Sequence, residues 1–170
     1  MAGIRRRLAD RYSVTTFDYP YIAEGRRAPD RMETLVGCHR AVVGSIRGSR
    51  MVLGGKSMGG RIASHVGSGG VDAMFFLGYP LLPIGKSAPR DTSHLDLIGI
   101  PMLFVQGERD RLGPPDMIGR IAARLAHASM VVIPEADHSF KVPKRSGGDL
   151  DGVLDRLAGI IVEWLAGLTG

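Results

Sequence analysis

Cysteine is almost absent from this sequence, since Cys38 is the only one among 170 residues. A single thiol cannot close an internal disulfide, which excludes a small secreted scaffold held together by such bonds. Long apolar runs are also missing, because none approaches the ~20 residues that a membrane-spanning helix needs. The basic N-terminus lacks the apolar stretch of a secretory signal. We therefore expect a cytoplasmic protein with no membrane partner.

Aromatic residues and lysines are scarce as well. The chain has ten aromatic residues, and arginine outnumbers lysine 18 to 4 within a net charge of +5. A basic chain raises the question of a nucleic-acid partner. The basic residues are dispersed along the chain, however, and no aromatic residues alternate with them as they do in surfaces that stack bases. The composition therefore predicts no nucleic-acid partner.

The remaining composition is ordinary for a soluble globular domain, with 44% hydrophobic and 23% charged residues. A length of 170 residues suffices for one domain with a real core and is too short for two ordinary ones. We therefore predict a single domain over residues 1–170. No cluster of histidine, cysteine or carboxylate residues has metal-ligand spacing, so no metal site is predicted.

Short apolar segments alternate with segments of helical period. The expected strands are residues 12–19, 50–55, 73–80, 101–110 and 129–138, the last two of which end in polar loops. The expected helices are residues 30–46, with Asp30 as its cap and Glu33 as capping-box partner, 58–67, 114–128 and 150–168. Apolar strands separated by helices predict an α/β fold with a mostly parallel sheet covered on both faces. In such a sheet the chemistry gathers at the C-terminal ends of the strands.

The stretch "VLGGKSMGG", residues 52–60, fits two kinds of site. A phosphate-binding loop needs a glycine five residues before its "GK", and that position is Arg50. The other interpretation is a nucleophile elbow, G-x-S-x-G, in which a strand, a tight turn and a helix expose a serine at the turn. The strand "MVLGG" before Ser57 and the helical segment after it favour the elbow.

An elbow hydrolase carries its acid and its histidine, in that order, after the serine. Asp110 directly follows the strand "MLFVQ" and its "GER", and His138 follows the strand "MVVIP" and its "EAD". A histidine can accept the serine proton at neutral pH, and a buried carboxylate can hold its ring in the required tautomer. We therefore predict that Ser57, Asp110 and His138 converge at neighbouring strand ends.

Each of these residues has an ordinary alternative role. Ser57 is compatible with a helix cap, Asp110 with a turn and His138 with an exposed surface position. Their joint placement at three strand ends is what favours catalysis. The other histidines are weaker candidates, because three lie inside predicted helices and one lies in a loop: His39, His65, His127 and His94. Cys38 is expected to pack in a helix.

The segments "GGKSMGGRIAS", "LGYPLLPIGK", "HLDLIGIPMLFVQGERDRLG" and "ADHSF" resemble the α/β-hydrolase-like domain of the KANL3/Tex30 family, relatives of dienelactone hydrolases. The resemblance extends from about residue 12 to the C-terminus. It implies an α/β-hydrolase fold with Ser57 as nucleophile, Asp110 as acid, His138 as base and no cofactor. Dienelactone hydrolases carry cysteine at the nucleophile position, so Ser57 argues against that specific activity.

Members of that family begin with a strand and an HGxG-like loop, whereas this sequence starts inside the following helix, at "GIRRRLADR". We therefore expect the N-terminal strands of the fold to be missing. In the sheet of the family fold, the absent strand lies between the predicted strands over residues 12–17 and 51–54. If the 170 residues fold alone, we expect these two strands to pair directly. Two other outcomes are that a second chain donates the strand, or that the natural protein starts roughly 30 residues upstream and supplies it. We favour the upstream start. The missing loop would supply one oxyanion N–H and Met58 the other, so we expect weakened activity.

The sequence thus predicts a serine hydrolase that cleaves an ester or similar acyl bond of a small molecule. Four side chains are expected near the substrate pocket: Tyr19, Tyr21, Lys56 and Tyr79. The alternative function is a catalytically silent hydrolase-fold scaffold that binds protein partners, because a fold does not settle a function. A homo-oligomer is left open.

Overall fold

The computed structural model describes residues 2–48, 50–143 and 149–168. Its centre is a sheet of four parallel strands whose spatial order, β1-β2-β3-β4, follows the chain. The strands are β1 (Val52–Lys56), β2 (Ala73–Leu77), β3 (Met102–Gly107) and β4 (Ala128–Ile133). The central strands β2 and β3 are buried along their whole length. The expected parallel sheet is confirmed.

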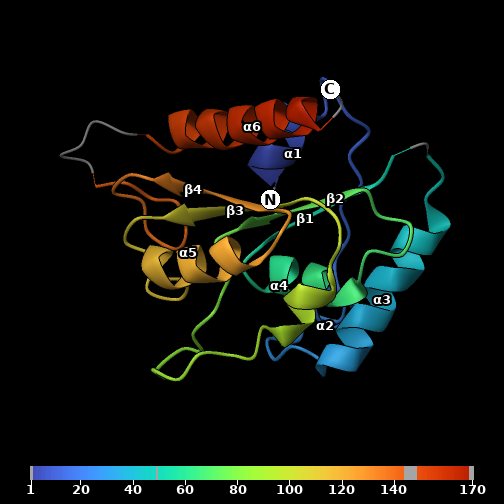
Figure 1. The fold of residues 1–170 in the computed structure, drawn as a ribbon. Helices are drawn as coiled ribbons and strands as arrows, with labels where there is room; N and C mark the ends of the chain where they lie inside the picture. Colours follow the sequence, from blue (N-terminus) through green and yellow to red (C-terminus); the bar gives the residue numbers. More distant parts are fainter. Residues whose placement is uncertain (1, 49, 144–148, 169–170) are drawn as a thin grey trace.

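Helices cover both faces of this sheet (Figure 1). One face carries α1 (Ala2–Leu8) and α6 (Leu150–Gly167), which pack against each other. The other face carries the remaining helical elements: α2 (Pro20–Ala23), α3 (Met32–Ser45), α4 (Met58–Val66), α5 (Pro115–Arg124) and the 3₁₀ helix η1 (Ser93–Leu97). None of the described helices combines the length and apolar character needed to cross a membrane.

Alternate side chains of the buried strands enter two separate cores. In β2, Met74 and Phe76 pack into the core beneath α3, α4 and α5, whereas Phe75 and Leu77 pack into the core beneath α1 and α6. Successive residues of a strand point to opposite faces, so both faces of β2 must be apolar. This explains why the strand sequences are apolar without a polar alternation.

The predicted strand over residues 12–19 is wrong. This segment is not assigned to a strand, and β1 pairs with β2 alone among the described residues. Val14 packs against the core of α1 and α6, while Phe17 and Tyr19 pack against the core of α3 and α4. The segment, blue in Figure 1, therefore passes from one face of the sheet to the other without joining it. Direct pairing of residues 12–17 with β1, expected for these residues folding alone, does not occur.

Two helix boundaries also differ from expectation. Arg31, not Asp30, is the N-cap of α3, and no side chain caps that helix. Asp30 instead forms a 2.8 Å ion pair with Arg26, which lowers the pKa of its carboxyl. Helix α5 ends at Arg124, so His127 lies in the turn before β4 rather than inside a helix. Cys38 lies in α3 and packs against the core as expected.

Candidate active site

Ser57 occupies a sharp turn between β1 and α4. Its backbone angles are φ 53° and ψ −122°, a left-handed conformation that residues other than glycine rarely adopt. The Ser57 N–H donates to the carbonyl of Leu77 at 2.9 Å, and the Ser57 carbonyl accepts from Arg61 N–H at 3.1 Å. The turn is therefore fixed on one side by β2 and on the other by the first turn of α4. A strained serine at a strand-to-helix turn is the geometry of a nucleophile elbow.

Two glycines allow the helix to approach the strand at this turn. A Cβ atom at Gly55 would collide with the backbone of Gly59 and Gly60, and a Cβ at Gly60 would lie 2.8 Å from the carbonyl oxygen of Gly55. Gly59, in contrast, has open space around its missing Cβ. The glycines of "GGKSMGG" are thus not equivalent, because only some of them set the distance between β1 and α4.

The structure brings Ser57, His138 and Asp110 together. The Nε2 atom of His138 lies 2.8 Å from Ser57 Oγ. The Nδ1 atom of the same ring lies 2.8 Å from Oδ2 and 3.0 Å from Oδ1 of Asp110. The Asp110 side chain is fully buried, whereas that of His138 is 21% exposed. One ring nitrogen therefore faces a buried carboxylate and the other faces a serine hydroxyl.

Backbone groups hold the Asp110 carboxylate in place. Its Oδ1 accepts hydrogen bonds from the N–H groups of Leu112 and Gly113 at 2.8 and 3.0 Å. Gly78, at φ 64°, lies beside it, and a Cβ at that position would sit 3.4 Å from both Asp110 Oδ2 and His138 Nδ1. The turn that carries Asp110 therefore fixes its carboxylate, and Gly78 in the neighbouring loop leaves room for the imidazole.

His138 is positioned by a tight turn after β4. Asp137 Oδ1 accepts from Ser139 N–H at 2.8 Å and from Lys141 N–H at 2.9 Å. The preceding loop is tied to the one that carries Asp110, because Arg109 N–H donates to Ala136 O at 2.8 Å. The two loops that supply the acid and the histidine therefore form one hydrogen-bonded unit.

Gln106 is a supporting residue that the sequence analysis missed. It is completely buried at the end of β3. Its Oε1 accepts from Tyr79 N–H at 2.6 Å, and its Nε2 donates to Gly113 O at 2.8 Å. The amide thus links the loop after β2 to the turn around Asp110. Its signal was available, since glutamine is the one polar side chain in the strand "MLFVQG".

Two of the tyrosines expected near the pocket are packed into the core. The Tyr19 hydroxyl lies 3.0 Å from His39 Nδ1, and burial raises the Tyr19 pKa and lowers that of His39. The Tyr79 hydroxyl lies 3.3 Å from Ser64 Oγ, two turns along α4 from Ser57, and burial raises its pKa. Both phenols are therefore neutral packing groups, and their hydroxyls bond to residues other than Ser57.

The other predicted positions remain accessible. Tyr21 lies on α2, half-buried against the core. Lys56 immediately precedes Ser57 and is half-buried. Met58 is the first residue of α4, where backbone N–H groups have no partner within the helix. The roles expected for Tyr21 and Lys56 near the substrate pocket, and for Met58 in the oxyanion hole, stay predictions.

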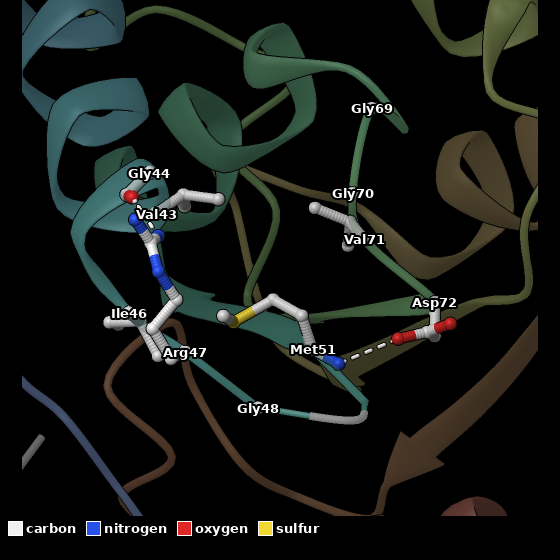
Figure 2. Close-up of a pocket in the computed structure, with 10 residues that line it drawn as sticks. All are labelled: Val43, Gly44, Ile46, Arg47, Gly48, Met51, Gly69, Gly70, Val71 and Asp72. Carbon is white, nitrogen blue, oxygen red and sulfur yellow. Dashed lines mark hydrogen bonds between the residues drawn. The ribbon is translucent and has the colours of Figure 1, made fainter.

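A separate hollow lies at the opposite end of the strands (Figure 2). Its lining includes Val43 and Arg47 from the α3 end, together with Met51 and Asp72, which directly precede β1 and β2. Met51 N–H donates to Asp72 Oδ2 at 2.6 Å across its floor. Ser57 follows β1 at the C-terminal edge, so this hollow is not part of the candidate active site. No cluster of three potential metal ligands occurs within the described residues.

Comparison with known proteins agrees with this architecture. A family model described as "Alpha/beta hydrolase domain" matches residues 1–166. No curated protein matches the sequence significantly.

Solved structures resemble the chain at low identity. An alpha-beta serine hydrolase homologue from Coxiella burnetii is 21% identical, with a TM-score of 0.68 over 96% of this chain and 74% of that one. Alpha/beta hydrolase domain-containing protein 10 from mouse is 15% identical, with a TM-score of 0.72 over 98% and 83%. The esterase domain of a Rhodothermus marinus protein is 17% identical, with a TM-score of 0.69 over 96% and 77%. At these identities the likeness establishes a shared fold, and with the family match it shows that the chain belongs to the alpha/beta hydrolase domain family.

Proposed function

We propose that this protein is a serine hydrolase that cleaves an ester or a similar acyl bond of a small molecule. The observation that carries the proposal is the hydrogen-bonded line from Ser57 Oγ through His138 to Asp110, with Ser57 in a left-handed backbone conformation. Similar structures described as a serine hydrolase homologue and an esterase domain give further support.

In the proposed reaction, His138 Nε2 accepts the proton of Ser57 Oγ while that oxygen attacks the carbonyl carbon of the substrate. Asp110 holds the Nδ1–H tautomer and stabilises the imidazolium that forms. His138 then gives the proton to the leaving alkoxide, which leaves an acyl group on Ser57. Water, deprotonated by the same imidazole, releases the acyl group and restores the serine.

We assign the Met58 N–H as a donor to the tetrahedral oxyanion, because it belongs to the residue after the nucleophile and opens helix α4. The second donor of the elbow hydrolases belongs to a loop that we do not identify among the described residues. Loss of one such donor lowers turnover by about 10²–10³. We therefore expect modest turnover of activated esters by these 170 residues.

A fluorophosphonate probe tests the proposal directly. The wild-type protein should become covalently labelled at Ser57 and should hydrolyse p-nitrophenyl acetate, and Ser57→Ala should do neither. Ser129→Ala, at an exposed position near the start of β4 and therefore at the opposite end of the strands from Ser57, serves as the matched hydroxyl control. A folded wild-type protein that neither labels nor turns over ester would favour the silent scaffold instead.

We also propose, on the motifs "GGKSMGG" and "QGERD", that the chain is of the KANL3/Tex30 type within the alpha/beta hydrolases, and that it acts in the cytoplasm. Both statements rest on the sequence.

A further inference from the structure

Four basic side chains gather along the side of α4 that faces η1 and the loop after β2. Arg61 and His65 come from α4, His94 from η1, and Arg90 from the segment that leads into η1. The rings of His65 and His94 are stacked with their centroids 3.6 Å apart. The charge of Arg61 acts on Arg90 and on both histidines. We call these four residues the basic cluster.

The two guanidinium groups of this cluster form no hydrogen bond or ion pair with the residues that the structure describes. The Nε atoms of Arg61 and Arg90 are buried without a hydrogen-bond acceptor, and neither side chain forms an ion pair with any described residue. Other arginines of the protein do find carboxylates, namely Arg7, Arg26, Arg120 and Arg124. Burying an unpaired charged donor costs free energy, which an anion could recover.

The remaining polar groups of the cluster do not supply that anion. The Asp91 carboxylate is near enough to act on Arg61 electrostatically, but its oxygens accept from Ser93 N–H at 2.9 Å and from Ser93 Oγ at 2.8 Å. The Nε2 atom of His65 is also buried without a partner. Within the described part of the chain, the cluster therefore holds two arginines without an ion pair and one imidazole nitrogen without a partner, and its nearby carboxylate, Asp91, is engaged by Ser93.

The basic cluster adjoins the candidate nucleophile. Arg61 lies one helical turn after Ser57, and its N–H donates to the Ser57 carbonyl at 3.1 Å. Side chains on a helix lean towards its N-terminus, so the Arg61 side chain leans towards the Ser57 end of α4. Arg90 N–H donates to Leu81 O at 2.9 Å, which ties Arg90 to the loop whose Gly78 borders His138. One turn of helix spans about 5.4 Å, a distance that a small substrate can bridge.

We propose that Arg61 and Arg90 bind an anionic group, a carboxylate or a phosphate, of the molecule whose acyl bond Ser57 attacks. This inference rests on the proposed function and narrows its substrate class to acidic esters. Planar guanidinium forks match the two oxygens of a carboxylate or phosphate, and arginine keeps its charge at any physiological pH. The anionic group would lie a few bonds from the scissile carbonyl, because the cluster begins one turn from Ser57.

The first experiment compares two activated esters of similar size, neutral p-nitrophenyl butyrate and the acidic mono-p-nitrophenyl ester of succinate. We expect wild-type kcat/KM to favour the acidic ester, and Arg61→Gln and Arg90→Gln to lower the acidic-to-neutral ratio by about tenfold each. Arg120→Gln, at an exposed site on α5, is the matched control and should keep the wild-type ratio. An equal ratio in all four proteins would overturn the inference.

The second experiment measures anion binding without catalysis. In Ser57→Ala, succinate and inorganic phosphate are compared with sodium chloride at equal ionic strength by thermal unfolding. We expect a concentration-dependent rise in Tm that Arg61→Gln and Arg90→Gln remove, and the better of the two anions identifies the acidic group. Absence of a specific rise, or its persistence in both arginine variants, would overturn the anion site. If Ser57→Ala binds the anion specifically but the wild-type protein is not labelled by the fluorophosphonate probe, the anion site is supported and the proposed hydrolase activity is refuted.

Discussion

The imidazole of His138 lies with Nδ1 2.8 Å from Oδ2 of Asp110, and that carboxylate also accepts two backbone N–H groups through Oδ1. The buried Asp110 carboxylate is thus held by hydrogen bonds within its own turn, in addition to its contact with His138. Asn in place of Asp would keep an oxygen for the turn and lose the negative charge. The pair therefore permits a test that separates catalysis from folding.

Asp110→Asn should lower kcat/KM for p-nitrophenyl acetate by about 10³–10⁴, because the neutral amide favours the wrong tautomer of His138 and cannot stabilise its cation. Its Tm should stay close to that of the wild type, since the bonds to Leu112 and Gly113 are preserved. Asp116→Asn, at an exposed ion pair on α5, should leave turnover unchanged. Wild-type turnover by a folded Asp110→Asn protein would contradict the role proposed for this carboxylate.

Gln106→Ala should lower the free energy of unfolding by about 2–4 kcal/mol, because it leaves both Tyr79 N–H and Gly113 O buried without a partner. Urea unfolding measures this directly. Ser129→Ala, at an exposed position on β4, is the control and should change stability by less than about 0.5 kcal/mol. A loss as small as that of the control would mean that the Gln106 amide does not hold the two loops together.

Much of this fold follows from periodicity, because β1 to β4 and α4 to α6 are set by local apolar patterns. The placement of Ser57, Asp110 and His138 after three strands follows from the same patterns. The predicted strand over residues 12–19 was wrong. Its β-branched and aromatic residues indicate burial in an extended backbone, but they do not indicate that a neighbouring strand is present. Gln106 and the basic cluster depend on contacts between segments distant in sequence, which no local pattern encodes.

Gly55→Ala should destabilise the protein by about 1–3 kcal/mol or more, because the added methyl group collides with the backbone of Gly59 and Gly60 rather than with a movable side chain. The same change should reduce fluorophosphonate labelling, since the elbow must open to accommodate it. Gly59→Ala is the matched control: its Cβ meets open space and alanine favours a helix, so stability should be equal or higher. Equal effects of the two changes would show that the close approach of β1 and α4 does not set the turn.

His94 predicts how stability depends on pH. Burial, followed by the positive fields of His65 and Arg61, lowers the pKa of His94 to about 4 from its ordinary value of 6.5. The folded protein therefore keeps this imidazole neutral in a pH range where the unfolded chain binds a proton, so the free energy of unfolding decreases as the pH falls from 6.5 towards 4.

His94→Gln tests this dependence. It keeps a polar group for Ser64 Oγ, which lies 2.9 Å from His94 Nε2, and removes the titration of the imidazole. Urea unfolding at pH 7.5 and pH 5.0 should show a smaller loss of stability for His94→Gln than for the wild type. Ser129→Ala, which changes no titratable group, should match the wild type. The measurements need phosphate-free buffers with chloride as the anion. Phosphate bound at the neighbouring arginines would favour the protonated His94 ring and would reduce the difference in stability loss between the wild type and His94→Gln. An identical loss in wild type and His94→Gln would mean that His94 titrates alike in the folded and unfolded chain.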